Sequence, residues 1–254
     1  MMNIFDTHAH YDDSRFDEDR TTLLSSFPDK GVSNIINCGT DLTTSRFTIE
    51  LTKQFDYIYG AVGIHPEEAD KADLSDLAEI EKMAADEKIV AIGEIGLDYY
   101  WDEVPKEKQL PFFEEQILLA NKLDLPVIIH DREAHGDTLE LLRKHSPKGV
   151  LHCFSGSPEM AKEVLNLGMY IGIGGAVTFK NAIKPVEVVK MLPLERLLLE
   201  TDCPYMAPVP FRGKRNDSSL IIYIAEKIAE IKVLSVSEVL NATEENAKRL
   251  FNIK

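Results

Sequence analysis

Eight short runs of branched apolar residues alternate with stretches of helical spacing along the 254 residues of this chain. Such an alternation is typical of parallel strands that are joined by helical crossovers. The expected strands are 3–8, 33–37, 58–64, 89–95, 126–130, 149–152, 169–172 and 196–201. One barrel domain of this kind has roughly 250 residues. We therefore predict the α/β class and a (β/α)₈ TIM barrel, formed as a single domain by residues 1–254.

Helix start and stop signals support the crossovers. Ser157 precedes Pro158, which suits a first helical position, and Gly168 follows the last apolar turn of the same segment. Helical spacing also covers 73–86, 106–124, 138–145, 219–232 and 235–251. Residues 204–216 are rich in proline, glycine and basic residues, which predicts a long loop after the eighth strand.

The composition excludes several classes of protein. A hydrophobic fraction of 44% and a mean hydropathy of -0.15 are typical of a soluble globular protein. We find neither a signal peptide nor an apolar run of roughly 20 residues, so we expect a cytoplasmic protein without a membrane partner. Cys38, Cys153 and Cys203 are widely spaced, which argues against a disulfide framework. We expect no obligate protein partner.

The net charge of -15 argues against a surface that attracts nucleic acid as a whole. Bound divalent cations can reverse the charge inside one pocket, however, because a metal is often the dominant charge of its site. A polyanionic substrate is therefore compatible with this chain only at a metal centre.

Potential metal ligands come at or just after the ends of the expected strands. They are His8, His10, Glu94, His130, His152 and Asp202. The C-terminal ends of barrel strands meet on one face, so we expect these side chains to converge there. Any one of them could be an idle polar residue at a strand end, but the whole set favours a metal centre. Four imidazoles and two carboxylates exceed the needs of one tetrahedral zinc and suffice for two divalent metal ions.

The pleat of a strand predicts which side chains share a face. Residues two apart point the same way, so His8 and His10 are expected to continue the face of Ile4. By the same rule Glu94 is expected to continue the face of Ile92. The expected sharing has His8, His10, Asp202 and Glu94 on one ion, and His130, His152 and Glu94 on the other.

Glu94 and Asp202 are the expected catalytic residues. Glu94 would bridge the two ions, and Asp202 would receive the proton of an activated water. Two ions about 3.5–4 Å apart can activate water and stabilise the leaving oxygen of a phosphodiester. Asp6 and Glu200 are expected one layer deeper, where a carboxylate either orients a ligand imidazole or makes a structural hydrogen bond.

Further polar residues are candidates for substrate binding. They are His65, Arg132, Ser155, Arg212 and Arg215. Arg132 could bind a phosphate or form a surface ion pair. Ser155 comes before a predicted helix N-terminus, where N–H groups favour anions. Arg212 and Arg215 belong to a compact basic cluster. The aromatic run 99–101 could stack a base or simply pack within its loop.

The motifs, in order, resemble the TatD family of metal-dependent deoxyribonucleases, which belongs to the amidohydrolase superfamily. They are FDTHAHYD, VGIHPE, IGEIGLDYY, IIHDREA, HCFSG, TDCPY, RGKRN and NAKRLF, from Asp6 to Phe251. The resemblance implies a barrel with two divalent metal ions (Mg, Mn or Zn) on the six ligands above. It also implies cleavage of DNA, with 3'-5' exonuclease action on single strands as the expectation and RNA as another possible substrate.

One departure from the family is visible. The family tends to follow RGKRN with Glu-Pro, whereas this chain has Asp217 and Ser218. We expect the change to leave the metal centre untouched and to alter the fit of substrate near 212–216.

Two other functions fit the same residues. One is a superfamily hydrolase of lactones, amides or phosphoesters, because a fold does not fix a substrate. Members with a carbamylated bridging lysine would need Lys in place of Glu94, which disfavours that subclass. The other is a protein that binds metal or DNA without catalysis.

Overall fold

The computed structural model describes residues 3–101 and 103–254, and its strands form one parallel sheet in chain order from β1 to β8. The strands are β1 (Ile4–Ala9), β2 (Val32–Cys38), β3 (Ile58–Val62), β4 (Ile89–Asp98), β5 (Val127–Arg132), β6 (Gly149–Leu151), β7 (Tyr170–Ile173) and β8 (Leu197–Leu199). The predicted (β/α)₈ barrel is confirmed. Each expected strand overlaps an observed one.

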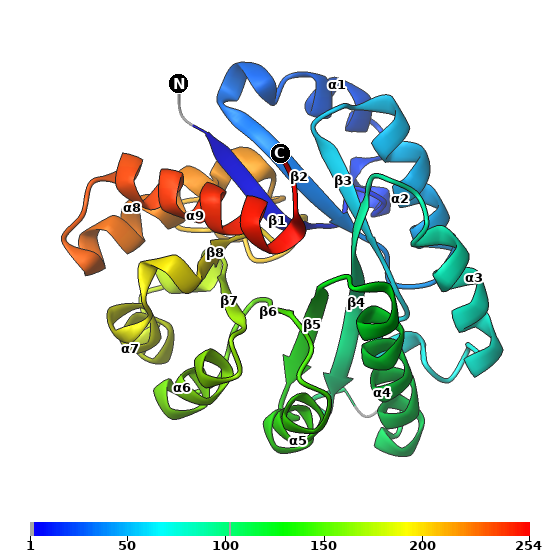
Figure 1. The fold of residues 1–254 in the computed structure, drawn as a ribbon. Helices are drawn as coiled ribbons and strands as arrows, with labels where there is room; N and C mark the ends of the chain where they lie inside the picture. The colour runs from blue at the N-terminus through cyan, green and yellow to red at the C-terminus, as the bar shows by residue number, and fades with distance from the viewer. Residues whose placement is uncertain (1–2, 102) are drawn as a thin grey trace.

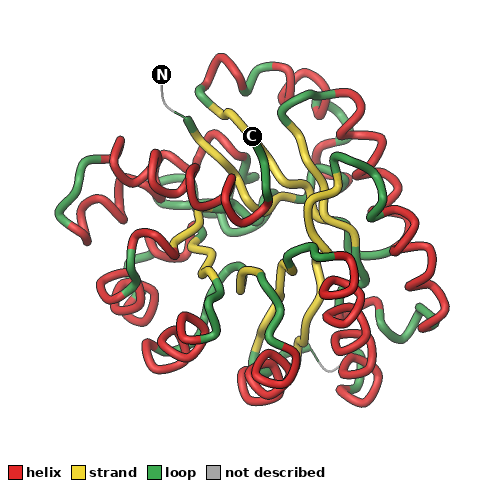
Figure 2. The backbone as a smooth tube through the Cα atoms, viewed as in Figure 1, coloured by secondary structure: helices red, strands yellow, loops and turns green. Residues whose placement is uncertain are grey.

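Helices surround the strands, as the outer ring in Figure 1 and the red segments of Figure 2 show. They are α1 (Arg20–Ser25), α2 (Leu42–Gln54), α3 (Leu77–Met83), α4 (Lys106–Leu123), α5 (His135–His145), α6 (Pro158–Asn166), α7 (Ile183–Met191), α8 (Ile221–Lys232) and α9 (Val236–Phe251). Short 3-10 turns lie at Ser14–Phe16, Pro28–Lys30, Pro66–Glu68, Leu74–Asp76, Gly175–Thr178, Leu194–Arg196 and Ser218–Leu220.

Helix capping explains where α6 begins and ends. The hydroxyl of Ser157 accepts a hydrogen bond from the backbone N–H of Met160, and Pro158 occupies the first turn. Gly168 adopts a left-handed φ of 80° just beyond the helix. The expected helix at 73–86 is instead divided, because Asp73 caps a separate 3-10 turn before α3 begins.

The barrel closes where β8 meets β1. The N–H of Asp202 donates to the carbonyl of His8 over 3.0 Å, and the N–H of His10 donates to the carbonyl of Cys203 over 2.8 Å. A parallel bridge also joins Ala9 to Cys203. This seam places the first and last candidate ligands of the chain side by side.

Two apolar clusters hold the layers together. The larger lies between the strands and the helices, and the smaller contains at least one residue from every strand together with Phe251 and Ile253 near the C-terminus. Figure 1 shows α9 crossing one end of the barrel. Full burial of a side chain such as Phe251 contributes about 1.5–3 kcal/mol. Because α9 closes that end, the mouth at the C-terminal ends of the strands is left for the site.

The simple alternation expected for β1 and β4 is wrong. Ile4 packs in the outer cluster and Phe5 in the inner one, and the pairing of β1 with β2 shifts between Asp6 and Ala9. The pairing of β4 with β5 shifts in the same way between Ile92 and Ile95. An extra residue in a strand re-aims the side chains that follow it. These irregularities turn His8 and Glu94 toward the mouth.

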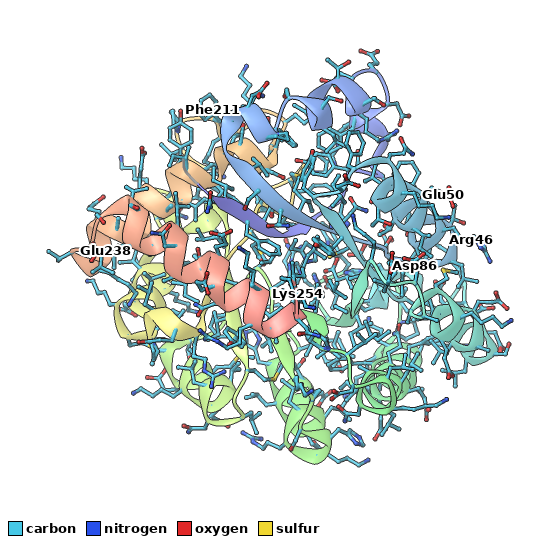
Figure 3. All side chains as sticks on the ribbon, turned by 45° about the horizontal axis from the view of Figure 1, so that its top comes forward. Arg46, Glu50, Asp86, Phe211, Glu238 and Lys254 are labelled. Atoms are coloured by element: carbon cyan, nitrogen blue, oxygen red, sulfur yellow. The ribbon has the colours of Figure 1, made fainter. Side chains whose placement is uncertain are left out.

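The outside of the helix ring is charged. Figure 3 shows Arg46 and Glu50 of α2 and Glu238 of α9 pointing away from the barrel. Within residues 3–101 and 103–254, no helix combines the length and the apolar character that a bilayer crossing requires.

Candidate metal centre

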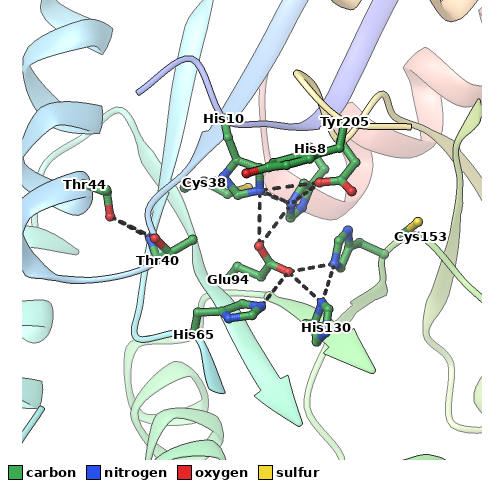
Figure 4. A network of polar contacts seen from close by, with 12 residues as sticks. His8, His10, Cys38, Thr40, Thr44, His65, Glu94, His130, Cys153 and Tyr205 are labelled. Carbon is green, nitrogen blue, oxygen red and sulfur yellow. Dashed lines mark hydrogen bonds and ion pairs between the residues drawn. The ribbon is translucent and has the colours of Figure 1, made fainter. Parts of the chain in front are cut away.

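Glu94 lies at the centre of the mouth, and its two carboxylate oxygens face different imidazoles (Figure 4). Its Oε2 lies 3.3 Å from Nε2 of His8 and 3.3 Å from Nε2 of His10. Its Oε1 lies 3.1 Å from Nδ1 of His130 and 2.8 Å from Nε2 of His152. The carboxylate thus stands between two imidazole pairs, which is the arrangement needed to bridge two cations.

Asp202 completes the first pair from the loop after β8. Its Oδ1 lies 3.6 Å from Nε2 of His10 and 3.8 Å from Nε2 of His8. The residue has a φ of 56°, a left-handed conformation that Asp tolerates better than most residues. Its side chain is 19% exposed, whereas that of Glu94 is 4% exposed. Asp202 is therefore the more solvent-accessible of the two carboxylates.

His65 lies beside the second pair. Its Nε2 is 3.5 Å from Oε1 of Glu94, and its ring centroid is 4.6 Å from that of His130. Its Nδ1 accepts a hydrogen bond from the N–H of Glu67, so in the neutral ring Nε2 carries the proton. His65 is thus oriented to donate to Glu94 rather than to offer a lone pair.

Two of the candidate ligand imidazoles are oriented by groups that the sequence did not reveal. The Nδ1 of His10 donates to the carbonyl of Cys38 over 3.0 Å, which leaves Nε2 free to face the centre. The Nε2 of His130 pairs with Oδ2 of Asp98 at 2.8 Å, which leaves Nδ1 for the centre. The available signal was the motif IGLDYY, in which Asp98 follows Glu94 on the same strand.

Asp6 and Glu200 are both fully buried but have different surroundings. Oε1 of Glu200 lies 3.7 Å from Nδ1 of His152, and burial raises the pKa of Glu200 to about 8. Asp6 faces the backbone and accepts hydrogen bonds from the N–H groups of His8 and Thr201. Asp6 therefore holds β1 against the end of β8, while Glu200 is the one that neighbours an imidazole.

Burial and the neighbouring side chains shift the pKa values of several groups in the centre. Burial raises the pKa of Glu94, but the neighbouring imidazoles of His152, His65 and His8 outweigh it and hold that pKa well below its usual value. Burial, assisted by His152, lowers the pKa of His8 to about 4, so this ring is neutral. Burial also lowers the pKa of His130, but its hydrogen bonds with Asp98 and Glu94 raise it to about 10.

These residues fit divalent cations. Three sets have three possible ligand atoms within 4.8 Å of one another: His8–His10–Glu94, His8–His152–Asp202 and His65–Glu94–His130. The third set needs the other tautomer of His65, in which the hydrogen bond from Glu67 to Nδ1 is lost. The buried Nδ1 of His152 and Oε2 of Glu200 have no hydrogen-bond partner within the described residues. Imidazole and carboxylate donors of this kind suit zinc, manganese or iron.

The sequence profile of the TatD-related DNase family matches residues 5–252. This chain belongs to that family. It is 46% identical over 253 residues to the uncharacterized metal-dependent hydrolase YabD of Bacillus subtilis, covering 98% of this chain and 99% of YabD. It is 36% identical over 258 residues to the uncharacterized metal-dependent hydrolase YcfH of Escherichia coli, covering 99% and 97% of the two chains.

A solved structure agrees with these relatives. The TatD homologue YjjV of Escherichia coli superposes with a TM-score of 0.93 and 33% sequence identity, covering 99% of this chain and 98% of that one. At this similarity both the TatD fold and the family are shared over nearly the full length.

The predicted substrate contacts of this TatD protein lie in varied surroundings. The guanidinium of Arg132 lies 3.9 Å from the ring centroid of Tyr100, and that of Arg212 lies 3.9 Å from the ring of Phe179. Ser155 is exposed in the loop before α6. Their roles in substrate binding stay predictions.

Arg215, from the same basic cluster as Arg212, is already engaged. It donates to both carboxylate oxygens of Asp19 over 2.7 and 2.6 Å and to the carbonyl of Arg15 over 2.8 Å. A phosphate would have to displace this ion pair before it could bind Arg215.

Ser218, one of the two residues that depart from the TatD pattern, contacts β1, the strand that carries His8. The sequence did not predict this contact. Ser218 is fully buried, and its hydroxyl donates to Oδ2 of Asp6 over 2.6 Å. Its N–H donates to the hydroxyl of Tyr11 over 2.9 Å. Asp217 caps the turn that begins at Ser218 by accepting from the N–H of Ser219.

Proposed function

We propose that this protein is a metal-dependent nuclease that hydrolyses phosphodiester bonds of DNA, with 3'-5' exonuclease action on single strands as its expected mode. The family name supports DNA as the substrate, and YabD and YcfH are named metal-dependent hydrolases. The observation that carries the proposal is the position of Glu94, whose two oxygens each face a pair of imidazoles.

Two divalent cations held by Glu94, Asp202 and the four histidines would supply an activated water and positive charge opposite the phosphate. The remaining roles belong to side chains of the protein. His10 and His130 are each fixed through their second ring nitrogen, so their orientation is set before substrate arrives. His65 lies beside this carboxylate, with its Nε2 3.5 Å from Oε1 of Glu94.

We assign to Asp202 the role of proton acceptor. Its pKa lies below the usual value, because the hydrogen bond from His10 and the neighbouring imidazoles outweigh the effect of burial. Its carboxylate is therefore ionised and faces the open mouth. A general base must lie within hydrogen-bond reach of the water that it deprotonates, and among the carboxylates of the centre Asp202 is the more exposed one.

The test uses single-stranded DNA labelled at the 3' or 5' end, with chelator treatment and add-back of magnesium, manganese or zinc. We expect cleavage only with metal, with mononucleotides released from the 3' end. Asp202→Asn should lower kcat by roughly 100-fold or more, as general-base catalysis contributes about 10²–10⁴-fold. The exposed Asp29→Asn serves as the matched control and should retain the wild-type rate.

A panel of lactones, amides and nitrophenyl phosphoesters tests the competing function under the same conditions. Rapid metal-dependent hydrolysis of a lactone or amide, without cleavage of DNA, would replace the nuclease assignment by the alternative one. Binding of DNA without cleavage in any of the three metals would instead support a non-catalytic protein.

A further inference from the structure

We propose that two aromatic–arginine pairs at the barrel mouth stack unpaired bases of a single DNA strand, one on each side of the metal centre. The first pair combines Tyr100 and Trp101 with Arg132, and the second combines Tyr205 with Arg15. The inference rests on the proposed nuclease function and adds to it the means by which a single strand is held.

The first pair follows β4 and β5. Tyr100 is 53% exposed and Trp101 is 47% exposed, and their rings lie edge to face with centroids 4.8 Å apart. The guanidinium carbon of Arg132 lies 3.9 Å from the centroid of Tyr100 and 5.3 Å from that of Trp101. Exposed aromatic rings beside arginine are the usual means by which proteins bind single strands without reading their sequence.

The three consecutive aromatic residues 99–101 have different surroundings. Tyr99, the first of the run, is partly buried, and its hydroxyl donates to Oδ2 of Asp137 over 2.7 Å. This residue packs within the structure. Tyr100 and Trp101 instead turn about half of their surface to solvent, although large aromatic side chains are normally well buried.

The second pair follows β8 and β1. Tyr205 is 48% exposed, and the guanidinium carbon of Arg15 lies 4.1 Å from its ring centroid. The N–H of Tyr205 donates to the carbonyl of Asp202 over 2.9 Å, which holds the backbone of Tyr205 close to that of a predicted catalytic residue. Figure 4 shows the ring of Tyr205 close to His10.

The two pairs are fixed on opposite sides of the centre. Oδ1 of Asp98 accepts from the N–H groups of Tyr100 and Trp101 over 2.9 and 3.2 Å, and Oδ2 of the same residue pairs with His130. In the ring of eight strands, the β4–β5 edge lies opposite the β8–β1 edge. A strand running from one pair to the other therefore crosses the metal centre.

The stacking partner must be unpaired. In a duplex both faces of each base are already covered by its neighbours, whereas the bases of single strands can be splayed onto aromatic rings. The net charge of -15 also weakens attraction to phosphates away from the centre, so stacking has to supply a larger share of the binding.

Trp101 is the one tryptophan of the sequence, so its fluorescence reports on this subsite directly. The probe is the Asp202→Asn protein loaded with metal, which is expected to bind DNA without cleaving it. A single-stranded oligonucleotide should quench the emission, and the same strand with abasic nucleotides should not. Equal quenching by the intact and abasic strands would overturn the proposal.

Kinetics supply the second test. In otherwise wild-type protein, Trp101→Ala and Tyr205→Ala should each lower kcat/KM for the single strand by roughly 5- to 100-fold, mainly through KM, since stacking contributes at this level per base. Trp101→Phe should recover most of the loss. When the nucleotide that would stack on one of these rings is abasic, replacing that ring by alanine should no longer lower kcat/KM. Val233→Ala, at a 90% exposed position between α8 and α9, is the control and should change nothing.

The failures are distinguishable. If the wild type cleaves intact and abasic strands equally fast, with metal, then the stacking proposal is wrong and the nuclease function stands. If the wild type cleaves no DNA with any of the metals, then both are wrong.

Discussion

The carboxylate of Asp98 accepts a hydrogen bond from the imidazole of His130 over 2.8 Å. Asp98 is almost fully buried and lies at the end of β4, two strand pleats beyond Glu94. Because Nε2 of His130 is occupied by this bond, Nδ1 is the atom directed at Glu94, 3.1 Å away. One side chain thus sets which nitrogen of His130 can meet a cation.

Asp98→Asn should weaken metal binding roughly 10- to 100-fold, the usual cost of losing a carboxylate that orients a ligand histidine. The amide is isosteric and still offers one oxygen to the loop after β4, so the fold should persist. Calorimetric titration with manganese or zinc measures the change. Asp137→Asn, which alters the partner of Tyr99 instead, is the matched control and should bind metal like the wild type. Unchanged affinity in the Asp98 variant would contradict the orienting role.

Glu94→Gln should abolish the tight binding of at least one of two cations. In the wild type each carboxylate oxygen of Glu94 faces one imidazole pair. In the variant an amide nitrogen, which cannot act as a ligand, replaces one of these oxygens. We expect the loss of activity to exceed the roughly 10- to 100-fold typical of an outer partner. Metal content by mass spectrometry, together with the rate of DNA hydrolysis, checks both points. The exposed Glu18→Gln is the control, and a Glu94 variant with two tightly bound ions would refute the bridging role.

The sequence is sufficient to predict the barrel and the convergence of the six candidate ligands. This is because His130, His152 and Asp202 come at the ends of apolar runs, and parallel strands bring such ends to one face. Each of these residues also has the strand parity of a buried inner residue, such as Ile128 for His130. Where a strand is regular, the alternation of its residues is enough to predict which side chains face inward.

Simple alternation fails for His8 and Glu94, because each lies within an irregularity of strand pairing that the residue types do not predict. Contacts between residues far apart in the sequence could not be predicted either. Ser218 meets Asp6 across 212 positions of sequence, and the turn that brings them together is fixed only when β8 closes on β1. Such contacts depend on the assembled barrel rather than on any local pattern.

Ser218→Ala should destabilise the protein by about 1–3 kcal/mol, the usual cost of leaving a buried polar partner unsatisfied. The change removes a donor to Asp6 and a partner of the Tyr11 hydroxyl, both of which are fully buried. Denaturant unfolding monitored by circular dichroism measures the free energy. Ser237→Ala on the exposed face of α9 is the control and should change stability by less than about 0.5 kcal/mol. Equal stability of the two variants would show that the Asp6 contact contributes nothing.

Removal of metal should lower the thermal stability of the protein. A ligand that binds only the folded state at 100 times its dissociation constant stabilises it by about 2.7 kcal/mol, which corresponds to a shift in Tm of about 5–10 °C for a domain of this size. Here the effect has a structural cause, since Glu94, His8 and His152 are nearly inaccessible to solvent and the unfolded chain cannot recreate their geometry. Scanning calorimetry with chelator, followed by add-back of manganese or zinc, measures the shift. Glu94→Gln should lose most of it under the same titration, whereas Glu18→Gln should keep all of it. Identical Tm values for chelated and metal-loaded wild type would mean that the cluster does not bind cations tightly enough to act as a metal centre.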